Sequence, residues 1–212
     1  MDRFTIMKDF IKKNGKKSEL SKGHTLNESF EEYLYFVDKG ILYINQDNAD
    51  GTTLIYKIVS PNNLLICDKF KYFYGKTDAT FYKVPIRIIK NNNGLYNLYM
   101  KLLVLENIKK DMFIRDMLTR NKLSSFLSVL IRLSNTFGVV EKDMVIIKIK
   151  ITQEELAQYC GTTRENVARI IKQLKDKNIL DTSSHFIKVI NIEEIKKMIP
   201  CENCENFVCN SF

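Results

Sequence analysis

Residues 151–174 read ITQEELAQYCGTTRENVARIIKQL and predict two short helices joined by a tight turn. Thr152 can cap the first helix, and Glu155, three residues later, can complete a capping box. Gly161 falls where the first helix must end, a position that favours a residue tolerating positive φ. The second helix can begin at once, with one of the two following threonines as its cap. Its apolar residues recur at helical spacing and form a buried stripe: Val167, Ile170, Ile171 and Leu174.

The opposite face of the second helix has the chemistry of base recognition. Arg can donate two parallel hydrogen bonds to guanine and Glu can accept one from cytosine, so an Arg-Glu pair can read adjacent base pairs in a major groove. A charged face alone usually indicates only an amphipathic hairpin in solvent. Here cap, glycine turn, stripe and charged face occur in register, which favours a helix-turn-helix that binds double-stranded DNA. The predicted DNA-binding residues are Thr163, Arg164, Glu165, Ala168 and Arg169.

Two further elements are predicted after this motif. Ile179–Asn191 reads as a hairpin, which would serve as a wing over the phosphate backbone. Ile192–Met198 reads as a short helix that is stopped by Pro200.

Upstream of the motif, the apolar pattern is helical from about Leu95 to Asn135. Four residues in it recur at steps of three, four and seven, as in the seam of a paired helix: Leu98, Leu102, Leu105 and Met112. The stripe fits either a helix packed on its own domain or a contact between two copies of the chain. Because the pattern extends past a small domain, we favour a homodimer.

The N-terminal part of the chain is predicted to be rich in β-strands. Turn formers separate runs of aromatic and β-branched residues at short, regular intervals; the runs are 33–37, 41–44, 52–59 and 80–89. Turns are expected at 38–40, 47–51 and 60–63. Strands of this kind suggest a small antiparallel barrel or sandwich. With the helices that follow, the predicted fold class is α+β.

The composition is that of a globular protein, and 212 residues suffice for two domains. The sequence has neither a signal peptide nor an apolar run long enough to span a bilayer, so we expect a cytoplasmic protein without a membrane partner. The net charge of +8 suggests a polyanionic partner, but residues 151–200 hold eight basic and seven acidic residues, so bulk charge is weak evidence. With two histidines, no nucleophile beside a base and no phosphate loop, the sequence does not indicate an enzyme.

Three of the five cysteines, Cys201, Cys204 and Cys209, lie within the last twelve residues. Disulfides are not expected in the cytoplasm, and thiolate is the donor that both iron-sulfur clusters and zinc prefer. Three thiolates leave a fourth position, for which the candidates are Cys160, His185 and a carboxylate. A structural zinc site and free redox thiols remain the alternatives to a cluster.

Together these features resemble the CRP/FNR family of bacterial transcription regulators. The order of β-domain, long helix and winged helix-turn-helix covers residues 20–200, and residues 163–169, TRENVAR, match the recognition pattern Arg-Glu-x-Val-x-Arg. The resemblance implies that Arg164, Glu165 and Arg169 read bases in a palindromic operator with TGTGA-like half-sites. It also implies RNA polymerase as a partner.

The same resemblance implies an architecture. The expected parts are a β-roll of the cyclic-nucleotide-binding jelly-roll type over 1–94, a dimerisation helix region over 95–137, a winged helix-turn-helix over 138–199 and a cysteine-rich tail over 200–212. Members that bind cyclic nucleotides carry a Gly-Glu segment and an Arg-Ser or Arg-Thr pair, and residues 64–80 have neither. A phosphate in the barrel would lack its bidentate partner, so we do not expect a cyclic nucleotide.

The tail is similar to that of the Bacillus-type FNR subgroup, which carries a 4Fe-4S cluster on C-terminal cysteines at this spacing and on an aspartate of the dimer helix. The subgroup's Ile-Arg-Asp triplet matches residues 114–116, ahead of Ile-Arg-Leu-Ser-Asn at 131–135. The resemblance therefore implies Asp116 as the fourth ligand and oxygen, nitric oxide or redox state as the signal. The alternative is that Asp116 pairs with Arg120, one helical turn later.

Overall fold

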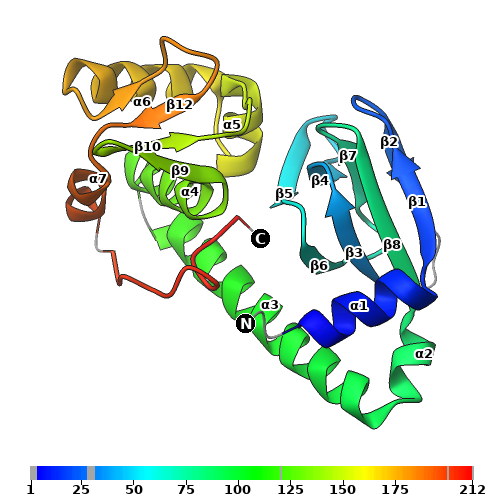
Figure 1. Ribbon diagram of the computed structural model, residues 1–212. Helices are drawn as coiled ribbons and strands as arrows, with labels where there is room; N and C mark the ends of the chain where they lie inside the picture. The colour runs from blue at the N-terminus through cyan, green and yellow to red at the C-terminus, as the bar shows by residue number, and fades with distance from the viewer. Residues whose placement is uncertain (1–3, 28–31, 120, 200, 212) are drawn as a thin grey trace. The chain divides into compact units, whose positions relative to one another are not determined.

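A computed structural model of the chain describes residues 4–27, 32–119, 121–199 and 201–211. The chain folds as two units, Met1–Asn107 and Ile108–Phe212. An N-terminal β-domain, a long helix and a C-terminal helix-turn-helix follow one another along the chain, so the predicted α+β class is confirmed (Figure 1). No helix in the described part of the chain is both long and apolar enough to cross a membrane.

Within the described residues of the first unit, eight strands form two antiparallel four-stranded sheets, ordered β1-β8-β3-β6 and β2-β7-β4-β5 (Figure 1). The strands are β1 (Lys16–Leu20), β2 (Thr25–Asn27), β3 (Tyr33–Lys39), β4 (Leu42–Asp47), β5 (Thr53–Val59), β6 (Asn63–Ile66), β7 (Tyr72–Gly75) and β8 (Ala79–Pro85). The expected turns between β3 and β6 are confirmed, and Gly40 and Gly51 supply positive φ in two of them.

The space between the two sheets is filled by apolar side chains. Phe73 of one sheet meets Tyr35 and Phe81 of the other edge-on, with ring centroids 5.0 and 5.6 Å away. All three rings are fully buried. Edge-to-face aromatic packing of this kind adds about 0.5–1.5 kcal/mol per pair beyond the burial of area.

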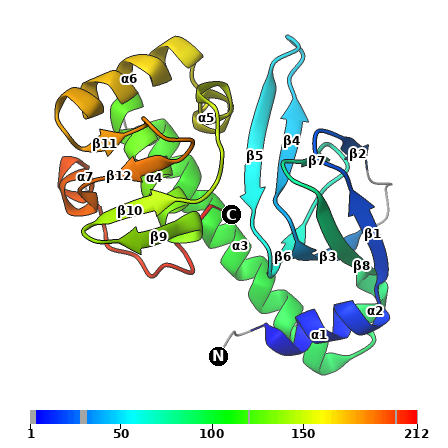
Figure 2. The same cartoon turned by 45° about the horizontal axis from the view of Figure 1, so that its top comes forward.

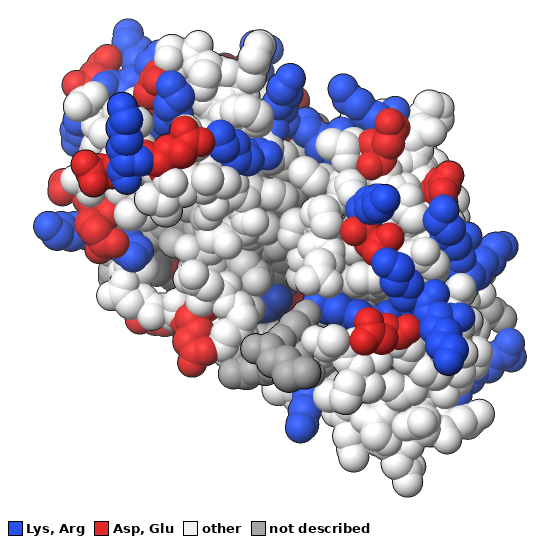
Figure 3. Space-filling view, viewed as in Figure 1, with Lys and Arg blue, Asp and Glu red and all other residues white. Residues whose placement is uncertain are grey.

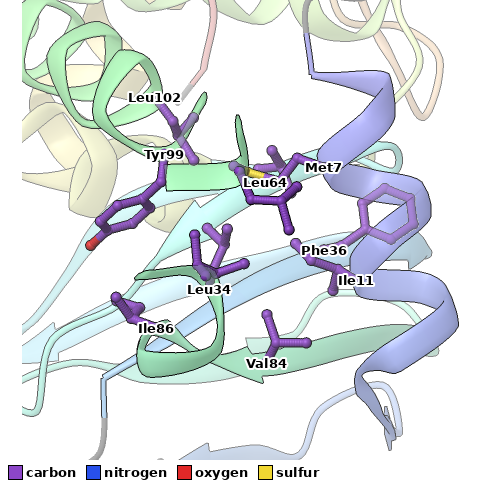
Figure 4. Close-up of a cluster of buried hydrophobic side chains, with 11 residues drawn as sticks. Met7, Ile11, Leu34, Phe36, Leu64, Val84, Ile86, Tyr99 and Leu102 are labelled. Atoms are coloured by element: carbon purple, nitrogen blue, oxygen red, sulfur yellow. The ribbon is translucent and has the colours of Figure 1, made fainter. Parts of the chain in front are cut away.

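A second cluster lies on the outer face of the first sheet, under α1 (Thr5–Asn14), α2 (Ile86–Lys90) and the start of α3 (Asn93–Thr119). Figure 4 shows Met7 and Ile11 of α1 packed with Phe36 and Val84 of the sheet. Helix α1 was not predicted from the sequence. The expected strand over 80–89 is corrected, because the strand ends at Pro85 and the next residues form α2, whose Ile86 and Ile89 both enter this cluster.

The expected continuous helix from Leu95 to Asn135 is also corrected. The chain forms two helices, α3 and α4 (Lys122–Phe137), and Asn121 is the N-cap of α4. Asn121 has extended backbone, and its side chain accepts a hydrogen bond from the Ser124 amide. An asparagine cap of this kind starts a new helix and ends the regular hydrogen bonding of the one before it.

The predicted seam of α3 lies against its own domain near the start of the helix. Leu102 is buried in the cluster under α1, and Leu98 packs against that cluster. A different face of α3 is apolar and exposed, with Val104 at 59% and Leu118 at 78%. This exposed stripe follows helical spacing: Tyr96, Met100, Val104, Ile108, Ile114 and Leu118.

The second unit holds α4, α5 (Gln153–Cys160), α6 (Arg164–Asp176) and α7 (Ile192–Met198) with a four-stranded sheet ordered β11-β12-β10-β9 (Figure 2). Its strands are β9 (Gly138–Glu141), β10 (Met144–Ile147), β11 (Leu180–Asp181) and β12 (Ile187–Val189). The hairpin and the last helix match their predicted ranges, whereas β9 and β10 were not predicted. Pro200, the expected stop of α7, lies outside the described residues.

Candidate DNA-binding helix and thiol-lined cavity

The turn between α5 and α6 is fixed by local interactions. The Thr152 hydroxyl accepts from the Glu155 amide at 3.1 Å, and the Glu155 carboxylate accepts from the Thr152 amide at 2.7 Å, which completes the predicted capping box. Gly161 then adopts the left-handed conformation, with φ 59° and ψ 46°. Of the two candidate caps of α6, Thr163 is the one used, because its side chain accepts from the Asn166 amide at 3.3 Å.

Helix α6 packs against α5 through the predicted apolar stripe. Its four members are at most 5% exposed: Val167, Ile170, Ile171 and Leu174. Ala157 of α5 is buried too, and its small side chain allows a close approach of the two helices. The stripe therefore turns the other side of α6 toward solvent.

The predicted DNA-binding residues lie on this solvent side, at the N-terminal end of α6. Thr163, Arg164, Glu165 and Arg169 are exposed, and Ala168 is half-buried. A hydrogen bond from its own backbone amide, together with the Thr163 side chain and the Arg164 charge, lowers the pKa of Glu165. Glu165 is therefore an ionised acceptor beside a cationic donor, the pair that the reading of adjacent bases needs. Their role in DNA binding remains a prediction.

Basic side chains do not form one continuous patch on the face shown in Figure 3. In Figure 3, Lys and Arg are interspersed with Asp and Glu over the face shown. This agrees with the near balance of charges in residues 151–200. Any contact with DNA would therefore depend on individual side chains, of which Arg164 is the predicted one.

The cysteine tail is held against α3 and α4. The Asn135 amide donates to the Cys209 carbonyl at 2.6 Å, and the Thr136 hydroxyl accepts from the Ser211 amide at 2.8 Å. Closer to α7, Arg115 and Glu202 form an ion pair at 2.9 Å. These three contacts fix both ends of the segment that contains the three thiols.

The three tail cysteines and Asp116 line one cavity of about 30 Å³. The other residues that line it are Met112, Arg115, Ser128, Ile131, Arg132, Ile199 and Glu202. The four predicted cofactor residues, three on the tail and one on α3, therefore line the same cavity. Across the described residues, however, no three His, Cys, Asp or Glu side chains are close enough together to hold a single metal ion.

Asp116 is 5% exposed and carries hydrogen bonds from α4. The Ser128 hydroxyl donates to its Oδ2 at 2.5 Å, and Arg132 Nη2 donates to the same oxygen at 3.0 Å. The Ser125 hydroxyl also donates to the Asp116 backbone carbonyl at 3.1 Å. The alternative partner Arg120 lies outside the described residues. The last turn of α3 is therefore joined to α4 by an ion pair and two hydroxyls.

Sequence reasoning missed Arg132, which is 1% exposed and also lines the cavity. Its guanidinium lies 5.6 Å from the centroid of the Phe113 ring, and Phe113 stacks on Tyr159 of α5 at 5.3 Å. Arg132 and Asp116 are sixteen residues apart across a helix break, a spacing that no local rule connects. The sequence signal that could have revealed Arg132 is that it is the single charged residue in the mostly apolar segment 126–133 of α4.

The remaining candidate ligands lie elsewhere. Cys160 and His185 do not line this cavity, and His185 is exposed on the wing. Burial raises the pKa of Cys209, opposed by the positive charge of Arg132, and burial also raises the pKa of Cys204. Cys160 is buried, and the loss of solvent raises its pKa to about 12.

The Cys160 thiol should be inert in the folded protein. With a pKa of about 12, it stays protonated at pH 8, and the thiol form is not a nucleophile. We expect a thiol reagent to modify Cys67 and the three tail cysteines of the metal-free protein at pH 8 while Cys160 reacts only after denaturation. Peptide mass spectrometry measures the sites, and a Cys160→Ala variant should give the native labelling unchanged. Labelling of Cys160 at the rate of the tail thiols would contradict its burial.

Comparison with known proteins gives matches over both units. A family model for the Crp-like helix-turn-helix domain matches residues 122–198, beginning at the first residue of α4. The anaerobic regulatory protein of Bacillus subtilis (strain 168) is 28% identical over 193 residues, which cover 84% of this chain and 81% of that protein.

Two solved structures share the fold at low sequence identity. A variant of CooA from Carboxydothermus hydrogenoformans superimposes with a TM-score of 0.76 at 15% identity, over 93% of this chain and 92% of that one. A transcriptional regulator of the CRP family from Thermus thermophilus gives 0.70 at 13% identity, over 85% and 95%.

Proposed function

We propose that the chain is a DNA-binding transcription regulator of the CRP/FNR family, which the Crp-like helix-turn-helix match over residues 122–198 and the similarity to the anaerobic regulatory protein support. It would act as a homodimer whose binding to a palindromic operator is controlled by a 4Fe-4S cluster. The ligands would be Cys201, Cys204, Cys209 and Asp116. The main support for a cluster is that all four of these side chains line the same cavity. RNA polymerase would be the partner through which operator binding changes transcription, and the cytoplasm the site of action.

The proposal for DNA rests on the geometry of α6. Its N-terminal end exposes Arg164 and Glu165, while the apolar stripe holds the helix against α5. An Arg at this position suits the guanine of a TGTGA-like half-site, since it can bind O6 and N7 together. Two copies related by a dimer axis would read two half-sites one duplex turn apart.

The proposal for a dimer rests on the exposed apolar stripe of α3, defined above by six residues from Tyr96 to Leu118. A stripe at helical spacing that is open to water is a surface that a second helix can cover. The predicted seam of Leu98 and Leu102 is used within the first unit, so we assign the contact between copies to the exposed stripe instead.

The donor set fits an iron-sulfur cluster. Thiolates are its usual ligands, and each ligand binds a different corner of the cluster, so the sulfur atoms need not converge on one point. A zinc ion would need four donors around one centre, and zinc remains the alternative to the cluster. A bound cluster with one exchangeable carboxylate corner would supply the reactivity toward oxygen or nitric oxide.

The chain's own residues would carry a change at this cavity to the reading helix. Asp116 and Arg132 join α3 to α4, and Arg132 contacts Phe113, which stacks on Tyr159 one residue before the end of α5. A shift of Asp116 would therefore move groups that support the turn at Gly161.

The β-roll is an unfavourable site for a cyclic nucleotide. Tyr35, Phe73 and Phe81 occupy the space between the sheets, and residues 64–80 contain no arginine to pair with a phosphate. The expectation that the chain binds no cyclic nucleotide remains part of the proposal.

The assignment of base readers predicts a specific loss of selectivity. Arg164→Ala should reduce discrimination between a TGTGA palindrome and a site with the guanines changed by about 1–3 kcal/mol, because the bidentate contact is gone. Lys172→Ala is the matched control, since it removes one positive charge from an exposed position further along α6. It should weaken binding to both sites alike. Equal selectivity of wild type and Arg164→Ala would refute the assignment.

The assignment of ligands predicts iron loading that depends on the tail. Wild-type protein purified without oxygen should contain about four irons and four sulfides per chain and absorb at about 400 nm. Cys209→Ser should lose most of both, whereas Cys160→Ser, a cysteine outside the cavity, should keep them. Cys209 is the better test than Asp116, since removal of Asp116 leaves a buried arginine without its partner, at a cost of about 3–5 kcal/mol. Colourless wild type with bound zinc would favour the zinc alternative.

A further inference from the structure

Arg132 has more hydrogen-bonding capacity than the protein around it uses. Its Nη2 donates to Asp116, but its Nε and Nη1 have no hydrogen-bond partner among the described residues. The side chain is 1% exposed, so solvent does not reach it freely. A buried donor without a partner is unfavourable, so a site that keeps two of them is incomplete as it stands.

The surroundings of Arg132 indicate what would complete it. It lines the same cavity as Cys201, Cys204 and Cys209, and the ring of Phe113 covers its guanidinium at 5.6 Å. The other arginine of the cavity, Arg115, has 44% of its side chain exposed and is paired with Glu202. Arg132 is therefore the buried cation of a cavity whose other polar walls are three thiols, two carboxylates, the Ser128 hydroxyl and the exposed Arg115.

A cluster on three thiolates and one carboxylate is negatively charged, and its sulfur atoms accept hydrogen bonds from N–H groups. Such hydrogen bonds stabilise the more negative, reduced form and raise the reduction potential of the cluster. A partner that orients a ligand and also contacts the metal centre is typical of the shell around metal sites.

We propose that Arg132 is a positioning residue of the metal centre: its Nη2 holds Asp116 in place, and its Nε and Nη1 donate hydrogen bonds to sulfur. This inference rests on the proposed function, because it requires a cluster on Cys201, Cys204, Cys209 and Asp116. Ser128 also donates to Asp116, but unlike Arg132 it carries no charge and has no further donor.

The test compares Arg132→Lys with Ser128→Ala in the loaded, full-length protein. Lysine keeps the charge and can still donate to Asp116, but it lacks the two N–H groups at Nε and Nη1. Ser128→Ala weakens the hold on Asp116 while it leaves Arg132 intact. The readout is the reduction potential of the bound cluster, measured by anaerobic titration. In parallel, iron and sulfide contents show that each variant is loaded.

For Arg132→Lys we expect a shift toward the oxidised form of about tenfold in the oxidised-to-reduced ratio at a fixed potential, about 59 mV for one electron. Ser128→Ala should shift this ratio by less than about twofold. An unchanged potential in Arg132→Lys overturns the role of Arg132 and leaves the proposed function intact. An equal shift in both variants also overturns it, because the effect would then come from Asp116. Wild type without iron and sulfide overturns the proposed function, and this inference with it.

A measurement on wild type keeps the test decisive if Arg132→Lys fails to fold. Exchange into heavy water replaces N–H by N–D, so vibrational bands of the iron–sulfur bonds should shift where such groups donate to sulfur. We expect a shift in wild type and in Ser128→Ala. Bands that do not move in wild type would contradict the proposal.

Discussion

The buried ion pair between Asp116 and Arg132 is the contact on which the second unit's arrangement depends. It joins the last turn of α3 to the middle of α4, where the chain has broken one expected helix into two. Ser125 and Ser128 add hydrogen bonds to the same turn of α3. Because a buried charge without its partner costs several kcal/mol, the two helices can separate only if another group takes over one of the two charges.

The thiol-lined cavity lies beside this ion pair. Asp116 and Arg132 both line it, together with three cysteines on a tail that Asn135 and Thr136 hold against α4. A cluster bound there would add a second partner to each group, iron to the Asp116 carboxylate and sulfur to the Arg132 guanidinium. Phe113 and Tyr159 connect the site to the end of α5.

Local signals predicted helices α5 and α6 and the turn between them correctly, and non-local contacts explain the failures. The capping box at Thr152 and the left-handed Gly161 depend on residues within one or two helical turns, and both are found as expected. The break before α4, the use of Leu102 within its own domain and the role of Arg132 all depend on residues brought together by tertiary packing. A helical stripe cannot reveal which of its faces the same chain will cover. The cysteine spacing predicted a common site, but the arginine inside it could only be found from the fold.

The most direct test of this account is a double-mutant cycle on the metal-free chain, with Asp116→Ala, Arg132→Met and the double variant unfolded in urea. Each single change should lower the free energy of unfolding by about 3–5 kcal/mol, because it leaves an uncompensated buried group. The double variant should lose at least about 2 kcal/mol less than the sum of the two. If the loss in the double variant equals the sum of the two single losses to within about 0.5 kcal/mol, the pair is not coupled, and Asp116 and Arg132 do not hold α3 against α4.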